Sequence, residues 1–198
     1  ADSNTAVGYH SLLTNTTGHS NTALGSLALD ANTTGQYNTA VGIDAGGAIT
    51  TGANNTVFGS LALDANTTGG SNTAIGMHAL GTNTTASNNT AVGYQTLYVN
   101  TTGADNVAVG RLALTANTTA DQNTAVGSQA LDANTTGQSN TALGYAALSA
   151  NTTASNNTGI GRRALLANIT GTQNTAVGAA ALDAVTTSNN HVAVGYNS

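Results

Sequence analysis

The chain has 198 residues, and its 8 acidic and 3 basic residues give a net charge of −5. Only 6% of the residues are charged, so no basic stripe exists that could neutralise phosphates, which excludes a nucleic-acid-binding protein. The absence of Cys excludes a disulfide or thiolate–metal scaffold. No apolar run approaches the ~20 residues that a membrane-spanning helix needs, so we expect no membrane insertion.

One 17-residue unit with the consensus N-T-A-V-G-x-x-A-L-x-A-N-T-T-G-x-x repeats through the chain without insertion or deletion. We number the positions of each unit 1 to 17 from its first residue, which is Asn in every unit except the last, where His191 replaces it. The units begin at residues 4, 21, 38, 55, 72, 89, 106, 123, 140, 157, 174 and 191. A fixed period of this length predicts a solenoid, so residues 1–198 are predicted to form a single repeat array.

Each unit starts with a short strand at positions 2–4, which is followed by a Gly at position 5 in all twelve units. Val107 and Val192 replace the Thr of position 2, so we expect positions 2 and 4 to point into the coil. The Leu of position 9 is expected to join them in the core, with the Ala of position 8 in a tight wall. The Gly of position 5 indicates a backbone angle, or a close approach of another chain segment, that no other residue permits.

The Asn residues of positions 1 and 12 are expected at bends, where stacked amides satisfy turn backbone groups from coil to coil. The predicted fold is therefore an all-β parallel β-solenoid, or β-roll, of about twelve coils. At ~4.8 Å per coil the rod is roughly 50 Å long. Its interior is thin, which predicts a homo-oligomer. Leu at positions 7 and 10 and Tyr at position 6 are available for contacts between copies, at Leu13, Leu27, Leu61, Leu112, Leu166, Tyr9, Tyr94, Tyr145 and Tyr196.

The run N-T-A-V-G-x-x-A-L resembles repeats in the heads of trimeric autotransporter adhesins, and the longer phrase with N-T-T-G is similar to repeats of bacteriophage tail-fibre proteins. The resemblance covers Asn4 to Tyr196. It implies left-handed parallel β-rolls assembled as a homotrimer, a location outside the cell or on a virion or cell surface, and a cell-surface receptor as partner. The period of this chain is longer than that of adhesin-head coils.

Two Thr rows follow the Asn of position 12. Position 14 is Thr in all eleven units that contain it, whereas position 13 has Ile169 as its one exception. Because adjacent strand residues point to opposite faces, we expect only one row to face out, and we favour position 13. Its residues are the candidate site: Thr16, Thr33, Thr50, Thr67, Thr84, Thr101, Thr118, Thr135, Thr152 and Thr186.

No charged residue occupies positions 1–5, 8–9 or 11–15 of any unit. A flat, uncharged Thr ladder resembles the ice-binding faces of several antifreeze proteins. β-branching restricts χ1, so a Thr row presents methyls and hydroxyls on a regular lattice that could order water into ice. Ice or ordered water is therefore the leading predicted partner. In the alternative interpretation the Thr rows are ordinary ladder residues of a fibre or adhesin segment, favoured by strand propensity.

The titratable residues do not suggest catalysis. His10 and His78 share position 7 but lie four coils apart, which gives no metal-ligand spacing. The Asp residues of position 10 never occur in adjacent coils, so no paired-carboxylate site is predicted. No Ser has a recognisable base to activate it. We expect no enzyme activity, no cofactor and no metal.

Overall fold

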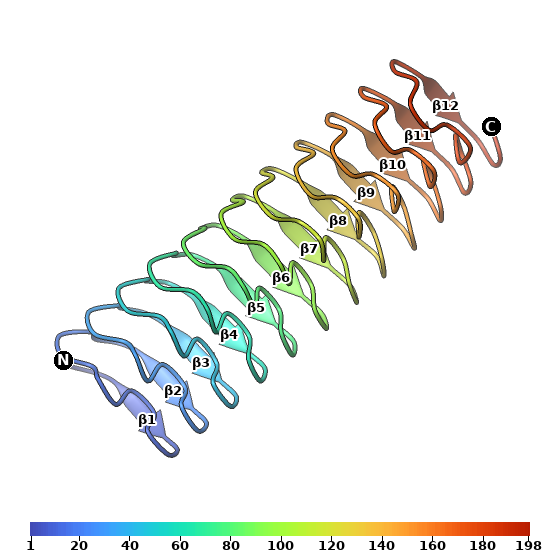
Figure 1. The fold of residues 1–198 in the computed structure, drawn as a ribbon. Coiled ribbons are helices and arrows are strands. Elements are labelled where there is room, and N and C mark those ends of the chain that lie inside the picture. Colours follow the sequence, from blue (N-terminus) through green and yellow to red (C-terminus); the bar gives the residue numbers. More distant parts are fainter.

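A computed structural model describes residues 1–198 as a rod of stacked coils, each of which contributes one three-residue strand to a single parallel sheet (Figure 1). The sheet has twelve strands in chain order, and the chain contains no helix. The parallel β-solenoid predicted from the sequence is confirmed. The strands are β1 (Thr5–Val7), β2 (Thr22–Leu24), β3 (Thr39–Val41), β4 (Thr56–Phe58), β5 (Thr73–Ile75), β6 (Thr90–Val92), β7 (Val107–Val109), β8 (Thr124–Val126), β9 (Thr141–Leu143), β10 (Thr158–Ile160), β11 (Thr175–Val177) and β12 (Val192–Val194).

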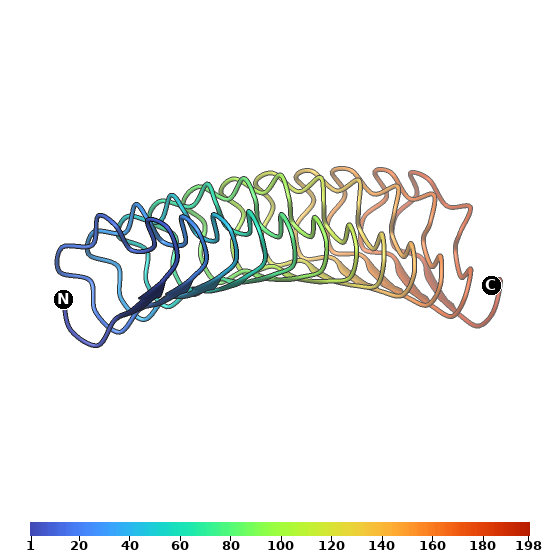
Figure 2. The ribbon, with the colours of Figure 1, turned by 90° about the horizontal axis from the view of Figure 1, so that it is seen from below.

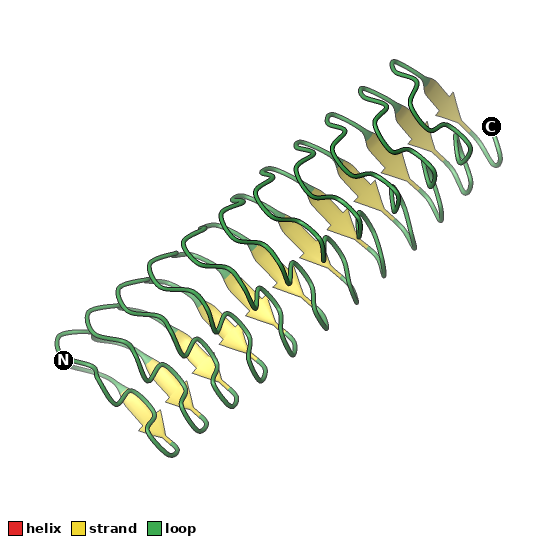
Figure 3. Ribbon diagram, in the orientation of Figure 1, coloured by secondary structure: helices red, strands yellow, loops and turns green.

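Equivalent positions stack directly on one another along the rod. In the sheet Thr5 pairs with Thr22, and the same register continues to the last coil. Outside the sheet, backbone hydrogen bonds also join neighbouring coils, as where the Leu29 amide donates to the Ala45 carbonyl. The sheet forms one side of the rod and loops form the rest (Figure 3). Each coil therefore contacts only its neighbours along the chain.

The side chains of the strands have the opposite orientation to the one expected from the sequence. Position 3 is buried, as at Ala40 and Ala108, whereas positions 2 and 4 face outward. The interior leaves little room behind the sheet: a Cβ added to Gly159 would lie 3.2 Å from the Ala164 carbonyl oxygen and 3.3 Å from Leu148 Cγ. The thin core takes the small residue of the strand, so the expectation that positions 2 and 4 point inward is wrong.

The core consists of the Ala residues of positions 3 and 8 and the Leu of position 9. These Leu residues have left-handed backbone angles, with φ of 51° at Leu29 and 49° at Leu114. Such a conformation costs roughly 1–2 kcal/mol for a residue with a Cβ. Full burial of a Leu side chain contributes about 1.5–3 kcal/mol, which offsets that cost. Burial of position 9 and the tight wall at position 8 agree with the sequence expectation.

The Gly of position 5 has a φ that side-chain-bearing residues avoid, for example 129° at Gly110. It also packs directly on the same Gly of the next coil, because a Cβ on Gly110 would lie 2.7 Å from the carbonyl oxygen of Gly127. Both causes proposed for its presence in every unit therefore operate together.

The Asn of position 1 forms a buried ladder along the rod. Asn38 Oδ1 accepts a hydrogen bond from the backbone N–H of Asn55 at 2.9 Å, and Asn38 Nδ2 donates to the Gly52 carbonyl at 2.8 Å. Asn21 to Asn174 of this row are almost completely buried. The amide of each side chain thus joins two coils and also closes its own coil.

A second Asn ladder runs through position 12. Asn100 Nδ2 donates to Asn83 Oδ1 of the preceding coil and to the Gly103 carbonyl, each at 2.9 Å. Ile49 and Val185 interrupt this ladder. The Oδ1 atoms of Asn32 and Asn168, which precede these two residues by one coil, are buried without a hydrogen-bond partner. Each interruption therefore leaves the Asn of the preceding coil without its side-chain donor.

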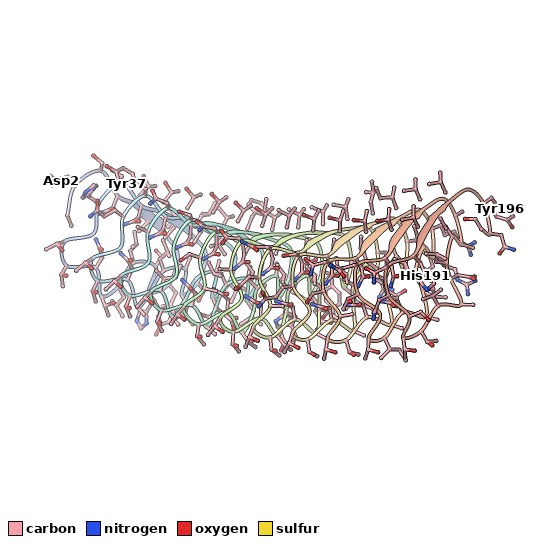
Figure 4. The ribbon with its side chains drawn as sticks, turned by 90° about the horizontal axis from the view of Figure 1, so that it is seen from above. Asp2, Tyr37, His191 and Tyr196 are labelled. Carbon is pink, nitrogen blue, oxygen red and sulfur yellow. The ribbon has the colours of Figure 1, made fainter.

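The rod is gently curved, and the sheet lies on its concave side (Figures 2 and 4). The strands thus form an inner face, while the returning loops of the coils form the outer, convex side.

Candidate functional site

Both Thr rows lie at the surface of the rod. The position-14 row (Thr17, Thr34, Thr51, Thr68, Thr85, Thr102, Thr119, Thr136, Thr153, Thr170 and Thr187) is exposed throughout. The position-13 row is exposed or half-buried in every coil. These residues lie in bends and not in a strand, so the alternation of strand side chains does not apply to them. The expectation that only one of the two rows faces out is wrong.

The hydroxyls of the position-13 row are held in a regular arrangement. All of them except that of Thr186 donate a hydrogen bond to the backbone carbonyl of position 13 in the next coil, as Thr101 does to Thr118 at 3.0 Å and Thr118 to Thr135 at 3.1 Å. This bond fixes the χ1 angle, and the oxygen keeps lone pairs for water. The series runs from Thr16 to Thr152, whose partner is the carbonyl of Ile169.

The position-14 row has no side-chain hydrogen bond within the protein, so its hydroxyls are free to bind water. The two rows together form an uncharged band, which we call the Thr band. Below it, the buried Asn residues of position 12 donate to the carbonyl of position 15, as Asn117 does to Ala120 at 3.0 Å. The Thr band is therefore supported by a hydrogen-bonded layer and does not depend on flexible loops.

Charged side chains lie beside the Thr band and not within it. Burial is the main cause that raises the pKa of Asp44 above its usual range, and the nearby charge of Asp30 raises it further. Burial also raises the pKa of Asp64, and the nearby charge of Asp44 raises this pKa further. A backbone hydrogen bond and the neighbouring His78 act in the opposite direction and lower the pKa of Asp64 in part. One oxygen of Asp64 is buried without a partner. This small acidic group, Asp30, Asp44 and Asp64, extends from the second to the fourth coil.

The outer sheet face, formed by the side chains of positions 2 and 4 in β1–β12, is the surface that sequence reasoning missed. Its position-4 residues include Leu24, Phe58 and Leu143, which are large apolar residues with exposed side chains. The residues expected to mediate association are mixed: Leu13, Tyr9 and the other Tyr residues of position 6 are exposed, whereas Leu27, Leu61, Leu112 and Leu166 are half-buried. The signal that identifies the outer sheet face is the variable size at position 4 beside a nearly constant Ala at position 3.

The surface holds no pocket, and no group of three or more His, Cys, Asp or Glu side chains is arranged to hold a metal ion. No helix is present that could cross a membrane. The features that repeat on the surface are thus rows of like side chains, namely the Thr band and the outer sheet face.

Comparison with other proteins finds no family model, curated protein or solved structure that matches the chain.

Proposed function

We propose that the protein is a non-enzymatic ice-binding protein that acts through the Thr band. The observation that carries the proposal is the continuity of the band. Thr occupies both rows in ten of eleven coils, both rows are accessible, and positions 11–15 contain no charge. Its partner is ice or the ordered water at an ice surface, and it needs no cofactor.

Two physical properties of the Thr band support ice binding: its side chains are regularly spaced, and it carries no charged groups that would hold water strongly. The coils repeat at about the strand spacing of ~4.8 Å, so the Thr methyls and hydroxyls form a lattice and not a scattered set. Hydroxyls of the position-13 row are fixed by backbone carbonyls, whereas those of the position-14 row can bond water directly. Charged groups, which would impose their own hydration shells, are absent from the band.

The test is ice affinity and thermal hysteresis of the purified protein. The double variants Thr102→Tyr/Thr119→Tyr and Thr101→Tyr/Thr118→Tyr place bulk on the position-14 row and the position-13 row respectively. Ser128→Tyr is the matched control, because position 6 already carries Tyr145 in the next coil. Circular dichroism checks that every variant keeps its strand signal.

We expect each Tyr double variant to lose most of the hysteresis and the control to keep it. Loss in only one double variant would restrict the site to that row. Wild-type protein that neither shapes ice nor partitions into it would overturn the proposal.

A second candidate function is a structural or receptor-binding segment of a tail fibre or adhesin, located outside the cell or on a virion or cell surface. The exposed apolar residues of the outer sheet face favour it, because side-by-side packing of rods is a use that the Thr band does not explain. This function predicts a stiff, elongated particle without ice activity. Binding to cell surfaces by the wild-type rod, together with an absence of hysteresis, would distinguish it from ice binding.

A further inference from the structure

The outer sheet face carries a continuous column of apolar side chains at position 4. Phe58, Leu24 and Leu143 are 57%, 48% and 46% exposed, and the in-register strands align them with Val, Ile and Leu at the same position in the other coils. Soluble monomers rarely leave a contiguous apolar surface of this kind uncovered. The exposed column therefore indicates a surface that a partner covers.

The same face has neither charged side chains that would bind a charged partner nor free backbone groups that would pair with an added strand. All twelve strands lack charged residues, and position 2 contributes Thr or Val. The backbone hydrogen bonds of β2–β11 are made within the sheet along the rod axis, so the face itself offers side chains only. A partner must therefore pack flat against Thr and aliphatic side chains.

We propose that the outer sheet face is an interface between copies of this chain, which associate side by side in a closed assembly with the sheets inside. The repeat selects this occupant, because a second copy offers the same side-chain rows at the same axial spacing over the whole length. The concave curvature agrees with it: rods that wind around a common axis present a concave inner face to that axis (Figure 2).

The size of the face is sufficient for a stable contact. It has two outward side chains on each of twelve strands, which is comparable with the ~20–30 residues per partner of a stable interface. The Thr band lies outside the sheet and stays accessible, so this proposal does not depend on ice binding.

The test places a charge in the middle of the column. Val109→Asp and Val126→Asp put a carboxylate at position 4 of the seventh and eighth coils, and the matched control Gln36→Asp puts one at an exposed position 16, where Asp121 already occurs. Light scattering gives the mass of each variant, and circular dichroism reports the fold. We expect wild type and control to have two or more times the chain mass, and the Val variants to dissociate at micromolar concentration.

A second variant keeps the test decisive if the Val→Asp chains fail to fold alone. The protein contains no Cys, so Val109→Cys adds one thiol at the centre of the face, and Gln36→Cys adds one away from it. Mild oxidation should convert most of the Val109→Cys protein into covalent dimers, with little cross-linking of the control. A monomeric wild type, or equal slow cross-linking of both Cys variants, would overturn the proposal.

Discussion

Ile49 fills the space that the missing side chain of Gly46 leaves in the third coil. A Cβ on Gly46 would lie 2.9 Å from Ile49 Cδ1, and every other coil has Leu at position 9. Gly46 replaces the usual Leu of position 9, and Ile49 replaces the usual Asn of position 12. The core stays filled, but Asn32 Oδ1 loses the side-chain donor that an Asn at position 12 would provide. The two departures from the repeat are thus coupled, because the larger side chain of Ile49 compensates for the side chain that Gly46 lacks.

We therefore expect strong coupling between these two positions. Gly46→Leu alone overfills the coil and should cost about 1–3 kcal/mol. Ile49→Asn alone leaves a void and should cost about 2–5 kcal/mol. The double variant restores the consensus and gives Asn32 a partner, so its free energy of unfolding, measured by urea titration, should be close to or above that of wild type. Additive losses in the double variant would show that the two residues are independent.

The two Gly positions of the repeat should differ sharply in their tolerance of Ala. Gly110→Ala forces a φ near 129° and a Cβ 2.7 Å from the Gly127 carbonyl, so it should destabilise the rod by more than ~2 kcal/mol. Gly103→Ala is the control, because its Cβ would also meet the carbonyl of the next coil, at Ala120, whereas position 15 has no positive φ and already contains Ala in Ala86 and Ala120. The comparison therefore isolates the effect of the backbone angle. Thermal unfolding followed by circular dichroism compares them, and an equal fall in both Tm values would contradict this account.

The stability of the third and fourth coils should depend on pH in the direction set by Asp44 and Asp64. Their pKa values are raised in the folded chain, so the native state binds protons more readily than the unfolded state. Stability should rise as the pH falls from neutral through the folded-state pKa toward the ordinary value of 3.8. Asp64→Asn should raise stability at neutral pH and flatten this dependence.

Asp105→Asn serves as the control for that experiment, because it also removes one negative charge but at an exposed position. Urea titrations at several pH values provide the measurement for both variants. A wild-type stability that falls between neutral pH and pH 4, or an Asp64→Asn dependence as steep as that of wild type, would argue against strained carboxylates in these coils.

The sequence predicted the solenoid and its phase, because these depend on a period that one unbroken repeat displays directly. It also located the buried Leu of position 9. The predicted orientation of the strand is wrong because Val107 in place of Thr does not indicate burial: an apolar outer face accepts Val as well as a core does. Position 4 varies from Val41 to Phe58, a range of volumes that a thin core of Ala and Leu side chains does not accommodate.

Other features of the fold depend on backbone angles that cannot be predicted from the residue types. Leu29 and Arg163 both have left-handed φ angles, although neither residue favours them. The bends at positions 13 and 14 place both Thr rows at the surface, whereas strand alternation would place one inside. The shared hydroxyl-to-carbonyl pattern of the position-13 row likewise depends on coil stacking and becomes visible only in three dimensions.

Each coil forms hydrogen bonds with no coils other than those next to it, and this determines how such a chain can change in length. Because Asn38 bonds to Asn55 in the same way that Asn123 bonds to Asn140, one coil presents to its successor almost the same surface as any other. Removing or duplicating a whole unit would rejoin matching surfaces without a new fold having to form. Recombination between misaligned repeats in the gene would thus lengthen or shorten the rod in single steps, and would adjust the area of both of its faces together.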